Sequence, residues 1–256
     1  MENWTDFPIL SFLVFFLVLW LASLLGAYLH RRMAVDEEER EDLGVVVGAT
    51  LTLLGLIIGF SFSMAVSRYD ERKNREANEA NAIGTEWYRL GLLPATEAAQ
   101  ARTLLKRYLA GRIEYYVVRN PQRLAENAST STKLQDQLWG TVQRVAAARP
   151  TPITGLTVSG LNDVIDSQGF VEAAYRNRIP VAAWGMLLAI SIFSSVLVPY
   201  NTKRRNPRAV ELWVLPLIMA IALFLIADLD SPRAGVIKVA PANLTDLATA
   251  FQRTMP

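Results

Sequence analysis

Four long apolar stretches constrain this chain more than any other feature of its sequence. They cover residues 8–29, 43–66, 179–200 and 211–230. Each stretch has about the 20 residues that a helix needs to cross the hydrocarbon core of a bilayer. The sequence therefore predicts an all-α integral membrane protein with four transmembrane helices, for which the lipid bilayer is the first partner.

The first apolar stretch differs from a secretory signal peptide. The residues before it, MENWTDF, contain no lysine or arginine, and its apolar core is longer than the core of a signal. No small-residue cleavage site follows it. We therefore expect residues 8–29 to be a retained transmembrane helix.

A polar region separates the second and third apolar stretches, and a short tail follows the fourth. The region, residues 67–178, repeats apolar residues at helical spacing between proline breaks, so we expect an extramembrane helical domain. The clearest apolar stripe contains Ala98, Ala101, Leu105, Leu109 and Ile113. The helices expected here cover 96–118, 122–148 and 160–178, and only residues 234–240 of the tail, 231–256, alternate weakly as a strand would.

The composition argues against an enzyme and against several kinds of ligand site. The chain has no cysteine and one histidine, so thiolate metal sites and thiol chemistry are excluded and a histidine-rich metal site is not expected. That histidine, His30, lies beside Arg31 at the end of the first stretch and is expected to be an interfacial residue. No phosphate-binding loop is present, and a net charge of +2 without a basic block argues against nucleic acid as a partner. We therefore expect no enzymatic activity, no metal and no cofactor.

The charges of the short loops predict the orientation in the membrane. Arg31 and Arg32 follow the first stretch, and the loop between the third and fourth stretches holds Lys203, Arg204, Arg205 and Arg208. Basic short loops stay in the cytoplasm, so both termini and the extramembrane domain are expected to face outward. Arg68, Arg72, Lys73, Arg176 and Arg178 make the ends of the polar region basic as well, which is the observation that opposes this orientation.

Small residues repeat along one face of the second apolar stretch. This glycine face consists of Gly44, Gly48, Gly55, Gly59 and Ser63. Small residues let two membrane helices approach closely, because apolar side chains gain nothing by leaving lipid for another apolar surface. Two interpretations remain open: a helix contact within one chain, or a contact between subunits that also serves as a pore wall.

No proline lies between Leu43 and Leu93, so the second helix is expected to continue into the charged stretch SRYDERKNREANEANAIGTEWYRLGLLP. At about 1.5 Å per residue such a helix would be on the order of 75 Å long. A long rigid helix of this kind is useful in an assembly in which neighbouring copies pack around an axis. We therefore expect a homo-oligomer.

Charged residues gather where the second and fourth apolar stretches end. This charge cluster consists of Arg68, Asp70, Arg72, Asp228 and Asp230. Charges at the edge of the hydrocarbon are costly unless they are paired or hydrated. We expect Arg68 to meet Asp228 or Asp230, either as a staple between two helix ends or as a charged ring at a pore mouth.

The stretch from VVVGATLTLLGLIIGF to LGLLP resembles the signature of the bestrophin-like family of bacterial and plant membrane proteins. The matching residues are Gly55 and Gly59, the triplet Arg68-Tyr69-Asp70, and a motif that contains Glu79, Asn81, Gly84 and Thr85. The C-terminal DLDSPRAGVIKV resembles the ending of the same family. The resemblance implies four membrane crossings with a helical extramembrane region, in a multi-pass protein of a bacterial inner or plasma membrane. It also implies a distant relation to the true bestrophins, which are oligomeric anion channels.

Two functions from different classes follow. The first is an ion-conducting oligomer whose pore is lined by the glycine face and by Ser191, Ser194 and Ser195, because small polar residues leave room for hydrated ions. The second is a structural or signalling assembly of the cell envelope that does not conduct and whose extramembrane helices bind a partner.

Overall fold

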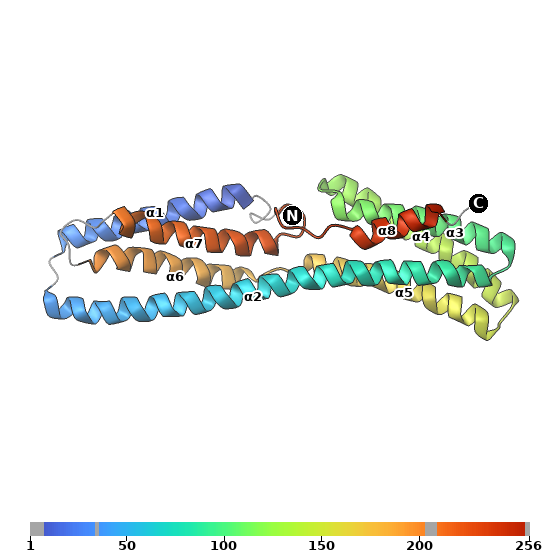
Figure 1. The fold of residues 1–256 in the computed structure, drawn as a ribbon, viewed down its shortest axis with the longest axis horizontal. Helices are drawn as coiled ribbons and strands as arrows, with labels where there is room; N and C mark the ends of the chain where they lie inside the picture. The colour runs from blue at the N-terminus through green and yellow to red at the C-terminus, as the bar shows by residue number, and fades with distance from the viewer. Residues whose placement is uncertain (1–7, 34–35, 203–208, 254–256) are drawn as a thin grey trace. The chain divides into compact units, whose positions relative to one another are not determined.

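The computed structural model describes residues 8–33, 36–202 and 209–253. Within these ranges the chain forms α-helices and one short 3-10 helix, with no strand, so the predicted all-α class is confirmed. Residues 234–240 contain turns and bends in place of the weakly predicted strand. The elements are α1 (Pro8–Arg32), α2 (Glu37–Arg89), η2 (Leu90–Leu92), α3 (Ala95–Val117), α4 (Pro121–Ala148), α5 (Pro152–Arg176), α6 (Val181–Tyr200), α7 (Ala209–Asp230) and α8 (Ala242–Arg253) (Figure 1).

The chain divides into two compact units, and α2 contributes to both. Unit 1 consists of Met1–Arg68 and Arg178–Ile237, and unit 2 of Tyr69–Asn177 and Lys238–Pro256. Among the described residues, four helical stretches are long and apolar enough to cross a membrane. The basic loop residues 203–208, on which the predicted orientation depends, lie outside the described residues.

Unit 1 is a helical bundle in which α1 packs along both α6 and α7 (Figure 1). Aromatic side chains fill the contacts: the ring of Phe15 stacks on that of Trp184 at 6.2 Å, and Phe12 meets Phe224 edge-on at 6.0 Å. Gly26 lets α1 approach α6 closely, because a Cβ at this position would overlap the backbone carbonyl of Val196. Small residues at helix contacts are the usual device for close packing in membranes.

The one histidine of the sequence, His30, lies near the C-terminal end of α1. Nδ1 of His30 lies 2.9 Å from the carbonyl oxygen of Tyr200, so the end of α1 is tied to the end of α6. The ring therefore has a structural partner at the position where the sequence places an interfacial residue.

Unit 2 has a core of its own, formed by the second part of α2 with α3, α4, α5 and α8. The helix starts are capped as their sequences favour. The side chain of Asn120 accepts hydrogen bonds from the backbone at the start of α4, and Thr151 forms a capping box with Thr154 at the start of α5. Each cap is followed by a proline, which is well tolerated in a first helical turn. The helix expected over 160–178 therefore begins earlier, at Pro152.

The last helix, α8, docks onto unit 2 through both side chains and caps. The ring of Phe251 stacks on Trp87 at 4.2 Å, and Leu244 is fully buried. Oε1 of Glu76 accepts a hydrogen bond of 3.0 Å from the backbone N–H of Leu244. A carboxylate at the N-terminus of a helix also interacts favourably with the helix dipole.

Candidate functional site

The membrane-spanning part of α2 is the least covered of the four apolar helices. Only 6% of its apolar window is buried, against 33%, 28% and 44% for the other three. Large apolar side chains of this segment point away from the chain, among them Val45 and Phe60. An apolar helix with so little cover inside its own chain has most of its surface free for lipid or for another copy.

The glycine face lies on this uncovered surface. A Cβ placed on Gly48, Gly55 or Gly59 would meet none of the described residues within 4 Å, and Ser63 is exposed. Gly44 is the exception, because a Cβ there would lie 3.4 Å from the side chain of Asn201. Among the residues that the structure describes, the glycine face therefore contacts another part of the same chain at Gly44 alone.

The serines of α6 are placed differently from the expected pore wall. Ser191, Ser194 and Ser195 are all buried inside unit 1. They lie on the face of α6 that includes the buried Trp184 and Leu187, which is the face that packs within the bundle. Their burial within one chain argues against the expectation that these serines line a pore, because a position on an apolar helix does not show which of its faces the bundle covers.

Asp228, at the end of α7, binds the loop that follows it. Oδ1 accepts a hydrogen bond of 2.6 Å from the N–H of Val236, and Oδ2 accepts one of 2.8 Å from Ile237. Gly235 is required in this loop, because a Cβ would lie 2.5 Å from the carbonyl oxygen of Asp228. The carboxylate of Asp228 therefore closes a turn and is satisfied by backbone donors.

Asp230 holds three parts of unit 1 together. Its Oδ1 accepts a hydrogen bond of 2.9 Å from the N–H of Ile179, just before α6, and lies 3.4 Å from Nη1 of Arg68 on α2. The side chain of Asp230 is 1% exposed and that of Arg68 is 16% exposed. The sequence predicted that Arg68 meets Asp228 or Asp230, and the structure pairs it with Asp230. Of the other charge-cluster members, Asp70 is exposed and Arg72 is buried, and both belong to unit 2.

These contacts predict a strong coupling between Arg68 and Asp230. Asp230→Asn should lower the free energy of unfolding by about 1–3 kcal/mol, since it weakens charge-assisted hydrogen bonds to two partners. Arg68→Gln should also destabilise the protein, and the double variant should lose less than the sum of the two. Thermal or chemical unfolding in detergent measures all three variants. Asp228→Asn combined with Arg68→Gln is the control and should couple more weakly; equal coupling to both aspartates would contradict the pairing.

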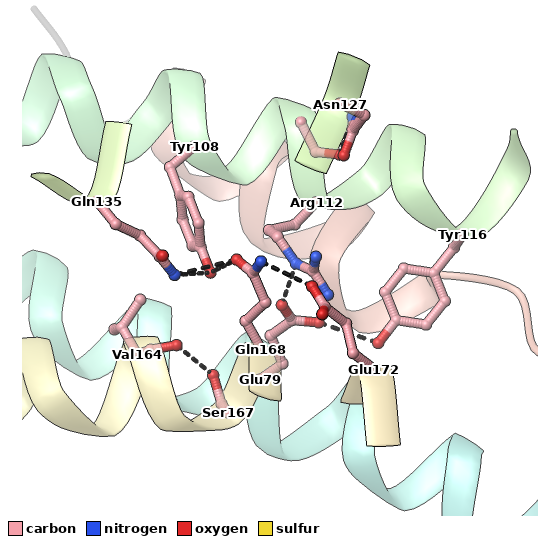
Figure 2. A network of polar contacts seen from close by, with 11 residues as sticks. Glu79, Tyr108, Arg112, Tyr116, Asn127, Gln135, Val164, Ser167, Gln168 and Glu172 are labelled. Atoms are coloured by element: carbon pink, nitrogen blue, oxygen red, sulfur yellow. Dashed lines mark hydrogen bonds and ion pairs between the residues drawn. The ribbon is translucent and has the colours of Figure 1, made fainter. Parts of the chain in front are cut away.

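The family-motif residues fall into two groups. Asn81 and Thr85 are exposed on α2, whereas Gly84 faces Leu247 of α8, whose Cδ1 would lie 3.2 Å from a Cβ. Glu79 is fully buried in unit 2. Nε of Arg112 donates a hydrogen bond to Oε1 of Glu79, as Figure 2 shows.

The buried Glu79–Arg112 ion pair is completed by aromatic side chains. The hydroxyl of Tyr116 donates a hydrogen bond of 2.9 Å to Oε2 of Glu79. The guanidinium carbon of Arg112 lies 4.4 Å from the centre of the Tyr115 ring. Burial raises the pKa of Glu79, and the charge of Arg112 opposes that rise. The pair is therefore a structural element in which the arginine offsets the cost of burying the carboxylate.

A second set of hydrogen-bonded side chains, from α3, α4 and α5, lies beside this ion pair (Figure 2). Oε1 of Gln168 accepts hydrogen bonds from the hydroxyl of Tyr108, at 2.8 Å, and from Nε2 of Gln135, at 3.0 Å. Nε2 of Gln168 donates a hydrogen bond of 2.8 Å to Oε1 of Glu172. Burial raises the pKa of the Tyr108 hydroxyl, so this side chain remains a neutral donor. The set connects α3, α4 and α5 and specifies how they pack.

The position of Arg112 in the sequence indicates that its side chain is buried, although the apolar residues of α3 draw attention away from it. Arg112 follows Leu105 by seven residues, so it lies on the buried stripe of α3, and an arginine in that position needs an acidic partner. The partner, Glu79, lies on another helix, and only the fold brings the two together. No group of three or more metal-binding side chains occurs in the ranges that the structure describes.

The chain is similar to known proteins both in sequence and in fold. The family described as Bestrophin-like domain matches residues 13–244. Among curated proteins, none matches the chain. Among solved structures, a mutant of a bacterial Bestrophin homolog from Klebsiella pneumoniae is 17% identical, with 96% of each chain covered and a TM-score of 0.61. A second structure of that homolog is also 17% identical, covers 94% of this chain and 98% of its own, and has a TM-score of 0.61. A structure described only as a membrane protein is 16% identical, with 96% of each chain covered and a TM-score of 0.63. At these identities the likeness concerns the fold.

Proposed function

Because this chain belongs to the Bestrophin-like family, we propose that it is a multi-pass membrane protein that assembles from identical copies and conducts ions along the glycine face of α2. One observation supports this proposal above the others. The glycines at positions 48, 55 and 59 have open space around them in the single chain, on the least buried of the apolar helices. Small residues leave room either for the backbone of a neighbouring copy or for a hydrated ion.

The two roles of the glycine face are compatible in a ring of subunits. In such a ring the same helix from each copy faces a common axis, and its small residues set the width of the path. The other helices of unit 1 then lie outward, toward lipid, where exposed apolar side chains such as Phe193 and Ile218 are favourable. No carboxylate, lysine or arginine occurs between Gly44 and Ser67, so the proposed path through the bilayer has no ring of charges of its own.

Reconstitution into liposomes tests this proposal. The purified full chain is inserted into vesicles that contain an anion-sensitive or a cation-sensitive dye, and flux is compared with that of protein-free vesicles. We expect flux above the control for one class of ion. If the protein assembles but neither class of ion crosses, the non-conducting envelope assembly becomes the better function.

We also propose that the extramembrane domain and both termini face outward, on the basis of the basic short loops. Reporter fusions at residues 100 and 140 should then report an external location, and a fusion at residue 205 an internal one. An internal signal at residue 140 would invert this orientation. The packing of the helices within the chain is the same for either orientation.

A further inference from the structure

Glu86, on α2 in unit 2, is a buried carboxyl group that the network around Glu79 does not include. Its side chain is 0% exposed, and neither of its oxygens has a hydrogen-bond partner among the described residues. An ionised carboxylate in such a position is very costly, and a group of this kind normally becomes neutral. The structure therefore places a proton-binding group inside an extramembrane unit.

A glycine of α5 makes room for Glu86. A Cβ on Gly160 would overlap both Oε2 of Glu86 and the guanidinium group of Arg89. The carboxyl and the guanidinium therefore adjoin the same small space, one helical turn apart on α2. The end of α2 is tied to α5 here, because the hydroxyl of Thr157 donates a hydrogen bond of 3.4 Å to the carbonyl oxygen of Arg89.

Arg89 already has a different carboxylate partner. Its Nη1 lies 3.3 Å from Oδ2 of Asp163 on α5, whose side chain is 60% exposed. The guanidinium group therefore has an ion pair with a solvated carboxylate, and it also adjoins a buried carboxyl with which it forms no hydrogen bond or ion pair.

Two charged groups act on Glu86, one from its own helix and one from α5. Burial, the largest influence, raises the pKa of Glu86 to about 8, while the charge of Arg89 on α2 opposes this rise and the charge of Asp163 on α5 adds to it. From α3, Arg102 and Lys106 lie over the ring of the neighbouring Trp87, at 5.0 and 5.1 Å from its centre. At neutral pH Glu86 is therefore mostly protonated, which agrees with its lack of an ionic partner.

We propose that Glu86, Arg89 and Asp163 form a proton-controlled exchange of ion pairs at the contact between α2 and α5. With Glu86 protonated, Arg89 pairs with Asp163 at the surface. When Glu86 releases its proton to solvent, the new carboxylate attracts the guanidinium inward, and Asp163 returns to water. The exchange forms and breaks no covalent bond other than the O–H bond of Glu86. It makes the packing of α5 on α2 depend on pH, and it does not depend on whether the protein conducts ions.

An infrared titration of the full-length protein tests the exchange. Wild type should show a protonated-carboxyl band that Glu86→Gln lacks and that disappears on titration with an apparent pKa of about 8. In Asp163→Asn the guanidinium loses its other partner, so the midpoint should move to lower pH by about half a unit or more. In Arg89→Gln it should move to higher pH. Asp166→Asn, which removes an exposed carboxylate from the same helix, is the matched control and should leave the midpoint unchanged.

Stability provides a second readout with a definite sign. Between the ordinary carboxyl pKa of 4.5 and the raised value of about 8, folded protein binds a proton at Glu86 that unfolded protein does not. Raising the pH through this window should therefore lower the stability of wild type, and Glu86→Gln should reduce that dependence. The inference is wrong if wild type has no carboxyl band that depends on Glu86, or if Asp163→Asn titrates with the midpoint of Asp166→Asn.

Discussion

Arg112→Met is expected to lower the free energy of unfolding by about 3–5 kcal/mol, because it leaves Glu79 buried without its cation. The two side chains are 1% and 0% exposed, so water cannot replace the lost partner. Folded proteins have only about 5–15 kcal/mol of stability in total, so this variant should melt far below wild type or fail to accumulate. Thermal unfolding of the detergent-solubilised protein, followed by circular dichroism, measures the loss.

Two comparison variants separate the buried ion pair from a general effect of removing an arginine. Arg75→Met breaks a largely solvated ion pair with Glu71, also on α2, and a contact with the ring of Phe170, and it should cost about 1 kcal/mol. The double variant Glu79→Met with Arg112→Met removes both charges and should be more stable than Arg112→Met alone. If Arg112→Met were no worse than Arg75→Met, the buried pair would have no special part in the stability of unit 2.

Gly55→Leu and Gly59→Leu are expected to abolish most of the proposed oligomer and most of the proposed ion flux. Neither substitution meets an obstacle inside the chain, since a Cβ at either position would have nothing within 4 Å. A leucine is therefore tolerated by the single subunit, but it would hold apart two backbones that need close approach or would narrow a path between copies. Native mass measurement and crosslinking report the assembly, and the liposome assay reports the flux.

Gly185→Leu is the matched control for this prediction. Gly185 lies on α6 in the same unit, is exposed and has equal space around it, but it is not on the glycine face. This variant should assemble and conduct as wild type does. If the α2 variants assembled and conducted normally as well, the glycine face would be in contact with lipid and the proposed pore wall would be wrong.

Hydropathy was sufficient to predict the class of the fold. Whether about 20 residues can cross a bilayer depends on their own length and polarity, and both are local properties. The continuity of α2 was likewise local, because the stretch after Leu43 holds no proline until Pro94 and the structure contains a single helix of 53 residues there. The helix α8 was missed, because 12 residues with mixed polarity become helical mainly through docking of their apolar face.

Partners from distant parts of the chain could be predicted only when topology limited the choice. Helix ends that emerge on the same side of a membrane lie at a similar depth, so the sequence limited Arg68 to two candidate aspartates. Only the tertiary structure identifies Asp230 as the partner. In it, the carboxylate of Asp228 already accepts hydrogen bonds from the backbone N–H groups of Val236 and Ile237. Arg112 and Glu79 had no such limit, because both lie within a helical region where many pairings are possible.

The sequence by itself determined which segments are apolar, which helices are continuous and where small residues repeat, since these depend on neighbouring residues and on helical spacing. Only the tertiary structure decided which face of each helix is covered. It left Gly48, Gly55 and Gly59 of α2 uncovered by the described residues and turned Ser191, Ser194 and Ser195 inward. The physical reason is that an apolar helix in a bilayer can bury any of its faces at similar hydrophobic cost, so the choice depends on close packing against particular neighbours.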